Sequence, residues 1–203
     1  MRSLLLAFGL AAVAATAASA ATVTSDFEGL TTTALVAPSV VSQGYTFSAS
    51  QGSNLAVLGN PSFCSPACPS DGTSILVFGI NSADINPSSI DPLVITGSKS
   101  FQLSGFDYAE LQPTGSPVNA TFLRVTGVLA DGSGDITRIV TLDGINDGPG
   151  GAADFQTEVF DSVFADSTFS EVDIRGMANS DRTGGFSLDN VVLTTGGGVP
   201  EPA

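Results

Sequence analysis

The stretch SFQLSGFDYAEL at 100–111 decides the fold class. Apolar and polar residues alternate along it, which is the period-two pattern of a β-strand with one buried face. The apolar positions change parity across Gly105, from Phe101 and Leu103 to Phe106 and Tyr108, which predicts a β-bulge at the glycine. A shorter apolar run at 92–96 is expected to form a separate strand, divided from the longer one by a turn at Gly97-Ser98.

The next segment predicts a β-hairpin. Residues 119–129 place Leu123 and Val125 on one face and Arg124 and Thr126 on the other. The run Asp131-Gly132-Ser133-Gly134 has the composition of a tight turn, and a strand at 136–142 is expected to return antiparallel.

Further short strands are expected along the rest of the chain, separated by clusters of Gly, Pro, Asn, Asp and Ser. Residues 74–78 form a compact segment that is apolar after Ser74, which favours a strand buried on both faces. The remaining candidates are 22–28, 44–48, 55–58, 157–163, 168–175 and 185–194. No helical spacing of apolar residues occurs after the first twenty residues. We therefore predict one all-β domain over 21–195, an antiparallel two-sheet β-sandwich of jelly-roll type.

The first twenty residues have the pattern of a secretory signal peptide. Arg2 supplies the positive region, residues 4–15 the apolar core and Ala18-Ser19-Ala20 the small-residue cleavage site. An uncleaved helix is the alternative. No later stretch is long and apolar enough to span a bilayer, so we expect a mature chain that starts near Ala21 and is exported through the inner membrane.

The charge balance excludes several functional classes. The chain has 20 acidic and 6 basic residues, no histidine and a formal net charge of −14. Such a chain repels nucleic acid and anionic membrane surfaces. Without histidine, the usual general base is missing and any hydrolase would depend on carboxylates. The same composition favours solubility and tolerates cations.

Two cysteines, Cys64 and Cys68, lie four positions apart. In an exported chain, an even and closely spaced pair indicates a disulfide that closes a small loop. A redox motif would have two intervening residues, and a zinc site would need further ligands.

The C-terminal tail carries a motif. After Gly196-Gly197-Gly198 come Val199, Pro200, Glu201 and Pro202, with Ala203 last. This ending resembles the start of the PEP-CTERM sorting signal of Gram-negative bacteria, in which an apolar helix and a basic cluster follow. The resemblance implies processing by an exosortase and a place at the cell surface or in the biofilm matrix. The sequence stops where the helix would begin, so either the signal is truncated or the protein is released.

The ends of the domain resemble carbohydrate-binding modules with a galactose-binding-like jelly roll. The matching segments are Asp26-Phe27-Glu28-Gly29-Leu30, residues 44–47 and the closing run at 185–193. In those modules, acids from the two ends meet and hold a structural calcium ion. The resemblance implies Glu28 and Asp189 as side-chain ligands, an oxygen set that suits Ca²⁺. The alternatives are a solvated acid at a strand end for Glu28 and a turn cap for Asp189.

One segment invites an enzymatic interpretation. Residues 171–176, Glu171-Val172-Asp173-Ile174-Arg175-Gly176, resemble the catalytic strand of laminarinase-like glycoside hydrolases. The second carboxylate that those enzymes need as proton donor is absent here, and the chain has no tryptophan to line a sugar cleft. Val172 and Ile174 should face the core while Glu171, Asp173 and Arg175 face outward, as in an ordinary half-exposed strand.

These observations predict an exported, non-catalytic cell-surface or extracellular-matrix protein. Adhesion or binding of an extracellular polysaccharide is the first hypothesis. A purely structural matrix component without a small ligand is the second, and a jelly-roll glycoside hydrolase is the third.

Overall fold

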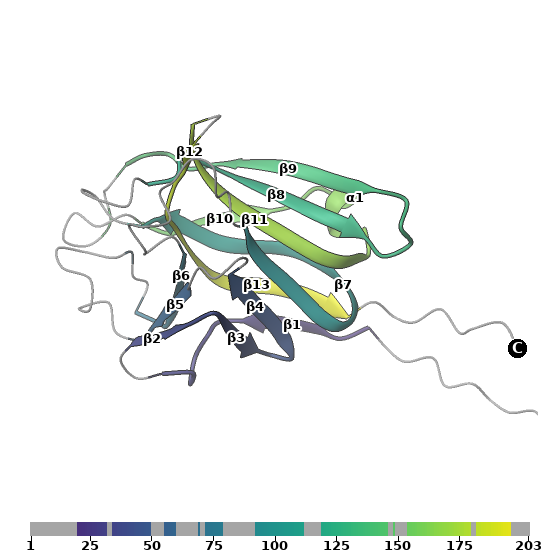
Figure 1. Cartoon of the computed structure of the whole chain (residues 1–203), viewed down its shortest axis with the longest axis horizontal. Coiled ribbons are helices and arrows are strands. Elements are labelled where there is room, and N and C mark those ends of the chain that lie inside the picture. Colours follow the sequence, from purple (N-terminus) through teal and green to yellow (C-terminus); the bar gives the residue numbers. More distant parts are fainter. Residues whose placement is uncertain are drawn as a thin grey trace, which may run out of the picture.

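The computed structural model describes residues 20–31, 34–49, 55–59, 69, 72–78, 92–111, 119–145, 148, 154–179 and 182–195. This part of the chain is mostly antiparallel β-structure, as predicted, and its strands belong to one sheet of 13 strands. The sheet curves so strongly that its strands surround the hydrophobic core (Figure 1). The strands are β1 (Thr22–Ser25), β2 (Ala34–Ala37), β3 (Ser39–Ser42), β4 (Tyr45–Ala49), β5 (Leu55–Leu58), β6 (Ile75–Phe78), β7 (Leu93–Glu110), β8 (Phe122–Leu129), β9 (Asp135–Thr141), β10 (Gln156–Val159), β11 (Phe169–Asn179), β12 (Arg182–Thr183) and β13 (Phe186–Thr195).

The strands form where the sequence alternates. In β8, Leu123 and Val125 are fully buried while Arg124 and Thr126 are partly exposed. In β6, Ile75, Leu76 and Val77 are all buried, which confirms the predicted strand covered on both faces. The β8–β9 hairpin is also confirmed, and Asp131 closes its turn by accepting a 2.9 Å hydrogen bond from the Ser133 amide.

The long strand β7 organises the fold. It is 18 residues long and pairs with β4 and β11 over its first part, then with β10 and β13 over its second part. The predicted turn at Gly97-Ser98 is therefore wrong, because the chain stays in one strand. The irregularity appears instead as a register shift in the pairing with β11, where Glu171 lies opposite Thr96 but Phe169 lies opposite Phe101.

The predicted bulge at Gly105 is confirmed. On β13, Val192 lies opposite Gly105 and Leu193 opposite Leu103, so β7 has one extra residue there. A Cβ on Gly105 would collide with the Glu158 carbonyl of β10, so the absence of a side chain at Gly105 lets β10 pair closely with β7. A compensating bulge in β13 lies at Asn190, whose φ of 48° is left-handed.

The two ends of the domain lie side by side. β1 pairs with β13 from Thr22 opposite Thr194 to Ser25 opposite Val191. β6 pairs with the other end of β13, from Leu76 opposite Leu188 to Phe78 opposite Phe186. Asp189 and Asn190 thus occupy the part of β13 between its two neighbours.

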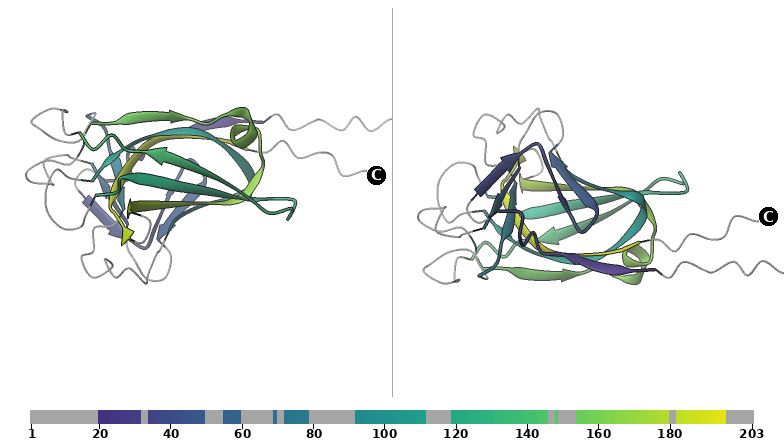
Figure 2. Two further views of the ribbon diagram at one scale, coloured as in Figure 1. Left: turned by 90° about the horizontal axis from the view of Figure 1, so that it is seen from above. Right: turned by 90° about the horizontal axis from the view of Figure 1, so that it is seen from below.

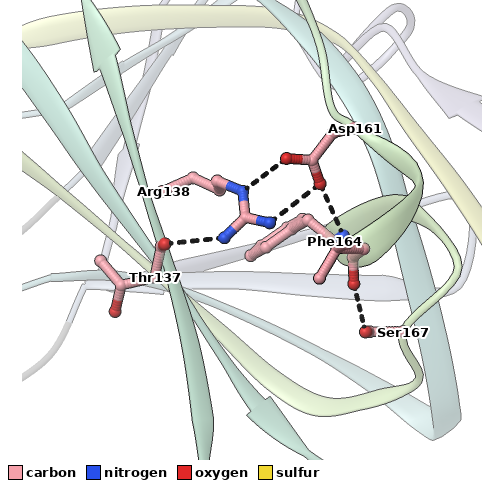
Figure 3. Close-up of polar contacts among 6 residues, drawn as sticks. Thr137, Arg138, Asp161, Phe164 and Ser167 are labelled. Atoms are coloured by element: carbon pink, nitrogen blue, oxygen red, sulfur yellow. Dashed lines mark hydrogen bonds and ion pairs between the residues drawn. The ribbon is translucent and has the colours of Figure 1, made fainter.

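One short helix was not predicted. The strand expected over 157–163 ends at Val159, and α1 (Ser162–Ala165) follows. Asp161 causes the change, because its carboxylate accepts a 3.0 Å hydrogen bond from the Phe164 amide and caps the helix. The same carboxylate forms a two-point contact with Arg138 of β9, at 2.9 and 3.1 Å (Figure 3).

The core is built from phenylalanines in place of tryptophan. Seven of them are among the largest fully buried side chains: Phe27, Phe47, Phe101, Phe106, Phe164, Phe169 and Phe186. Several rings meet edge to face, for example Phe27 and Phe47 with centroids 5.0 Å apart. The strands curve around a common interior in both views of Figure 2.

Several predicted features lie outside the described residues: the Cys64–Cys68 disulfide, the signal peptide up to residue 19, and Val199, Pro200, Glu201 and Pro202. Within the described ranges, no helix has the length and apolar character needed to cross a membrane.

Candidate functional site

The candidate site lies where β1 and β6 approach the middle of β13. The chain leaves β1 through Asp26 and turns sharply at Phe27 and Gly29, which have φ values of 56° and 76°. A left-handed phenylalanine is uncommon, and this one is held by complete burial against Phe47. Glu28 belongs to this turn and lies next to the start of β6.

Two consecutive residues before β6 contact both predicted calcium ligands. The Ser74 amide donates a 2.6 Å hydrogen bond to Oε1 of Glu28. The Thr73 hydroxyl donates a 2.8 Å hydrogen bond to Oδ2 of Asp189. Glu28 and Asp189 come from opposite ends of the domain, and both contact the dipeptide Thr73-Ser74.

The two carboxylates differ in their exposure. Glu28 is exposed, whereas Asp189 has no exposed surface. Burying a carboxylate is costly unless hydrogen bonds replace its hydration. Thr73 supplies one such bond to Asp189, and the Asn190 amide supplies another to Oδ1 at 2.7 Å.

The polar network continues across the sheet to Asp107 of β7. The side-chain amide of Asn190 donates a 2.8 Å hydrogen bond to Oδ2 of Asp107. From the other side, the Thr157 hydroxyl of β10 donates a 2.6 Å hydrogen bond to Oδ1 of the same carboxylate. Asn190 therefore links the two acids, because its main chain contacts Asp189 and its side chain contacts Asp107.

A cavity of about 310 Å³ lies beside this network, where β7, β10 and β13 run next to one another. The residues around it include Asp107, Thr157, Asn190, Val159 and Val192, and the surface that they present to it is almost entirely apolar. The two bulges in β7 and β13 lie at this place, since Ser104, Gly105 and Asn190 also line it.

The oxygen-rich junction has the right donor chemistry for a hard cation. Calcium takes carboxylate, hydroxyl and main-chain carbonyl oxygens in flexible geometry. Each carboxylate oxygen that accepts one hydrogen bond keeps a second lone pair for another partner. In the ranges that the structure describes, no three Asp, Glu, His or Cys side chains gather closely enough to hold a metal by themselves. An ion here would need main-chain or hydroxyl oxygens besides Glu28 and Asp189.

Residues 171–176, which resemble a catalytic strand of glycoside hydrolases, form part of β11 and do not belong to this junction. Val172 and Ile174 are fully buried while Glu171, Asp173 and Arg175 are partly exposed, which confirms the predicted alternation. The cross-strand neighbours of Asp173 are Val94 and Thr126, and those of Glu171 are Thr96 and Val128. Burial, followed by the negative charge of Glu171, raises the pKa of Asp173.

Another buried acid, Glu110, is the last residue of β7. It is 3% exposed, and its Oε1 accepts a 2.8 Å hydrogen bond from the Gly144 amide. Burial raises the pKa of Glu110, with smaller contributions in the same direction from Asp143 and Asp154. This arrangement ties the end of β7 to the loop after β9.

Sequence reasoning named Glu28 and Asp189 but missed Thr73, Ser74, Asp107 and Asn190. Asp107 had a weak signal, because it is a charged residue between the core residues Phe106 and Tyr108. Thr73 and Ser74 had none, since only the pairing of β6 with β13 places them at the junction.

Neither the protein-family models nor the curated proteins compared with this chain match it.

Proposed function

We propose that this chain is an exported, non-catalytic protein of the cell surface or extracellular matrix that binds a glycan. In this proposal, a calcium ion held by Glu28 and Asp189 stabilises the junction of the domain's two ends. The observation that carries the proposal is the contact of Thr73 and Ser74 with both acids.

The proposed architecture is a two-sheet sandwich of jelly-roll type. Its support is the division of strand pairing along β7. The first part of β7 continues through β4 and β3 on one side and through β11, β8 and β9 on the other. The second part continues through β13, β6, β5 and β2, with β10 on its opposite side. Strands that pass from one sheet to the other through bends and bulges are common in such sandwiches.

Export is supported by the sequence at both ends. The pattern of residues 1–20 favours secretion, and the Gly-linked motif at 199–202 favours an exosortase substrate of a Gram-negative bacterium. A net charge of −14 suits a calcium-containing exterior better than contact with nucleic acid.

The role proposed for calcium is structural. When bound, the ion would offset the charge of the buried Asp189 and tie the turn after β1 to β13. Thr73 and Ser74 orient the two carboxylates, and burial of Phe27 fixes the turn that carries Glu28.

Thermal unfolding with and without calcium tests the metal site. Protein collected after export should unfold at a higher temperature with calcium than with EDTA, because a ligand that binds only the folded state stabilises it. Glu28→Gln should abolish the difference, and the variant should still fold because Glu28 is exposed. Asp166→Asn, at an exposed acid of the α1 C-cap, is the matched control and should keep the full calcium effect. Equal unfolding temperatures of the wild type in calcium and EDTA would refute the metal site.

Polysaccharide pull-down tests the binding function. The wild type should be retained by matrix polysaccharide from the producing cell when calcium is present. A wild type that fails to bind glycan arrays and matrix polysaccharide under these conditions contradicts the proposal.

A second candidate is a structural matrix component that associates with itself. The sheet path ends at β2 and β9, which expose Val36 at 61% and Ile139 at 56%. Exposed apolar residues on edge strands favour pairing between chains. Sedimentation would then show concentration-dependent association that added sugars leave unchanged.

The glycoside hydrolase remains the third candidate. Its test is Glu171→Gln, which would remove any measured hydrolysis if that carboxylate were catalytic. Unchanged hydrolysis in the variant would exclude it.

A further inference from the structure

Two consecutive edge strands lie on one side of the molecule. Among the described strands, β2 pairs only with β5 and β3 only with β4, and a single residue, Pro38, separates β2 from β3. Figure 1 shows both strands along the lower side of the molecule. We call residues 34–42 the β2–β3 edge. An edge strand presents main-chain donors and acceptors with which a strand of another chain can pair.

The β2–β3 edge belongs to an uncharged part of the sequence. Residues 29–70, which include β2, β3, β4 and β5, contain none of the chain's 20 acidic and 6 basic residues. The rest of the chain therefore carries the whole net charge of −14. Two copies of so acidic a protein repel one another, and the repulsion is smallest when their uncharged sides face each other.

The same edge exposes aliphatic side chains. Val36 of β2 is 61% exposed and Val41 of β3 is 58% exposed. Leu35, which points to the opposite face of β2 from Val36, is 37% exposed. An aliphatic edge strand without charged residues is a template for pairing with another chain.

Val36 is the exposed end of a buried apolar row. It lies opposite Ala56 of β5, which in turn lies opposite Val77 of β6. Residues opposite one another on antiparallel strands point to the same face of the sheet. Ala56 and Val77 are each 1% exposed and belong to a second hydrophobic cluster outside the main core. A strand paired with β2 would extend this row and cover Val36.

Two other edge strands carry charges that oppose such pairing. β9 contains Asp135 and Arg138, and β10 contains Glu158. Charged side chains on an edge strand hinder pairing with another chain, because pairing would remove water from them. β2 and β3 contain no charged residue, so pairing costs less there than at β9 or β10.

We propose that two copies of this chain associate by antiparallel pairing of β2 with β2, around a two-fold axis near Val36. Two-fold symmetry brings the same surface of each copy into contact, and an antiparallel strand pair satisfies it. Val36 of one copy then meets Val36 of the other. Because β2 has only four residues, the dimer should be weak and reversible. This proposal specifies the contact for the second candidate function, self-association, and does not depend on glycan binding.

Sedimentation velocity of the exported protein, over a range of protein and salt concentrations, tests the contact. The wild type should form a dimer that tightens as salt is raised to about 0.5 M, because salt screens the repulsion between two acidic copies. Val36→Glu places two like charges next to each other at the axis and should weaken the dimer by at least roughly tenfold. Val159→Glu is the matched control and should dimerise as the wild type does at high salt, because Val159 is 76% exposed on β10, outside the proposed contact.

A charge exchange tests the symmetry of the contact. Val36→Lys alone should also weaken the dimer, because two lysines would meet at the axis. A mixture of Val36→Lys and Val36→Glu should form a mixed dimer that is tighter than the dimer of either variant alone, because opposite charges then lie across the axis. Each dilute variant should melt at the temperature of the wild type, since Val36 is exposed.

The outcomes separate this contact from the proposed functions. A wild type that stays monomeric at about 1 mM protein and high salt would overturn the contact and the self-association candidate together. If Val36→Glu dimerises as the wild type does, the β2 contact fails while self-association stands. Growth beyond a dimer, or no gain on mixing the two charged variants, would refute the two-fold arrangement. A monomeric wild type whose retention by matrix polysaccharide falls in Val36→Glu would assign the β2–β3 edge to glycan binding instead. A dimer that binds no glycan would refute the glycan proposal alone.

Discussion

Replacing Gly127 with alanine tests how the aromatic core holds β8 against β11. Gly127 is buried on β8 opposite Val172, and the ring of Phe169 lies directly over it. A Cβ at this position would enter the ring, with Cζ of Phe169 only 2.7 Å away. The ring has little freedom to withdraw, because Phe169 is fully buried and stacks on Phe164 at a centroid distance of 4.8 Å.

The magnitude follows from two opposing effects. Overpacking a well-filled core costs about 1–3 kcal/mol. Replacing glycine reduces the entropy of the unfolded chain, which offsets roughly 0.4–1 kcal/mol of this cost. The net loss should be about 1–2 kcal/mol, which lowers the melting temperature of a domain of this size by about 2–8 °C.

A double-mutant cycle measured by urea unfolding checks the cause. Phe169→Leu removes the ring, so Gly127→Ala should cost less in that background, with a coupling of about 0.5–3 kcal/mol. Val128→Ile adds a methylene group on the partly exposed face of the same strand and should change stability by less than about 0.5 kcal/mol. If Gly127→Ala is neutral, or if the two changes are additive, the ring does not fill the space above the glycine.

Three further predictions concern single side chains. Tyr45→Phe should raise the melting temperature by a few degrees, because the buried Tyr45 hydroxyl has no hydrogen-bond partner among the described residues, and such a group costs about 1–3 kcal/mol. A lower melting temperature would contradict this. Burial raises the pKa of Glu110 above its ordinary 4.5, so the folded state binds this proton more tightly than the unfolded state. The tighter proton binding stabilises the folded state below pH 4.5, and this stabilisation is lost as the pH rises through the raised pKa of Glu110. Glu110→Gln should therefore gain stability relative to the wild type as the pH rises from 4.5 to 7. A difference in unfolding free energy between the two proteins that stays constant over this range would refute the assignment. Asp161→Ala should lower the melting temperature more than Asp166→Ala, since only Asp161 both caps α1 and binds Arg138; equal effects would show that neither contact contributes.

The sequence predicts strands well where alternation is strong and poorly where tertiary contacts decide. The alternation in β8 and β11 and the parity change at Gly105 were sufficient to place core residues and a bulge. The Gly97-Ser98 pair has the composition of a turn, but Gly97 pairs with Tyr45 of β4, and the flanking residues Thr96 and Phe101 pair with β11, so the segment stays within β7. α1 was missed because it has only four residues, which is too short for a helical spacing of apolar residues to show in the sequence.

The candidate site shows the same limit. A resemblance at the two ends of the domain was enough to name Glu28 and Asp189. Thr73 and Ser74 directly precede β6 and Asp107 lies in β7, so only the sheet order reveals that they adjoin those acids. Asn190 has a left-handed backbone that no local pattern specifies.

The pairing of β1 with β13 has a consequence for biogenesis. Among the described strands, β1 pairs only with β13, so this pairing, which closes the domain, must wait until the last strand has been synthesised. Contacts between such distant positions also slow folding after synthesis. For a chain exported as proposed, this delay leaves time for threading through a translocation channel, and the domain would then mature outside the compartment in which it was made.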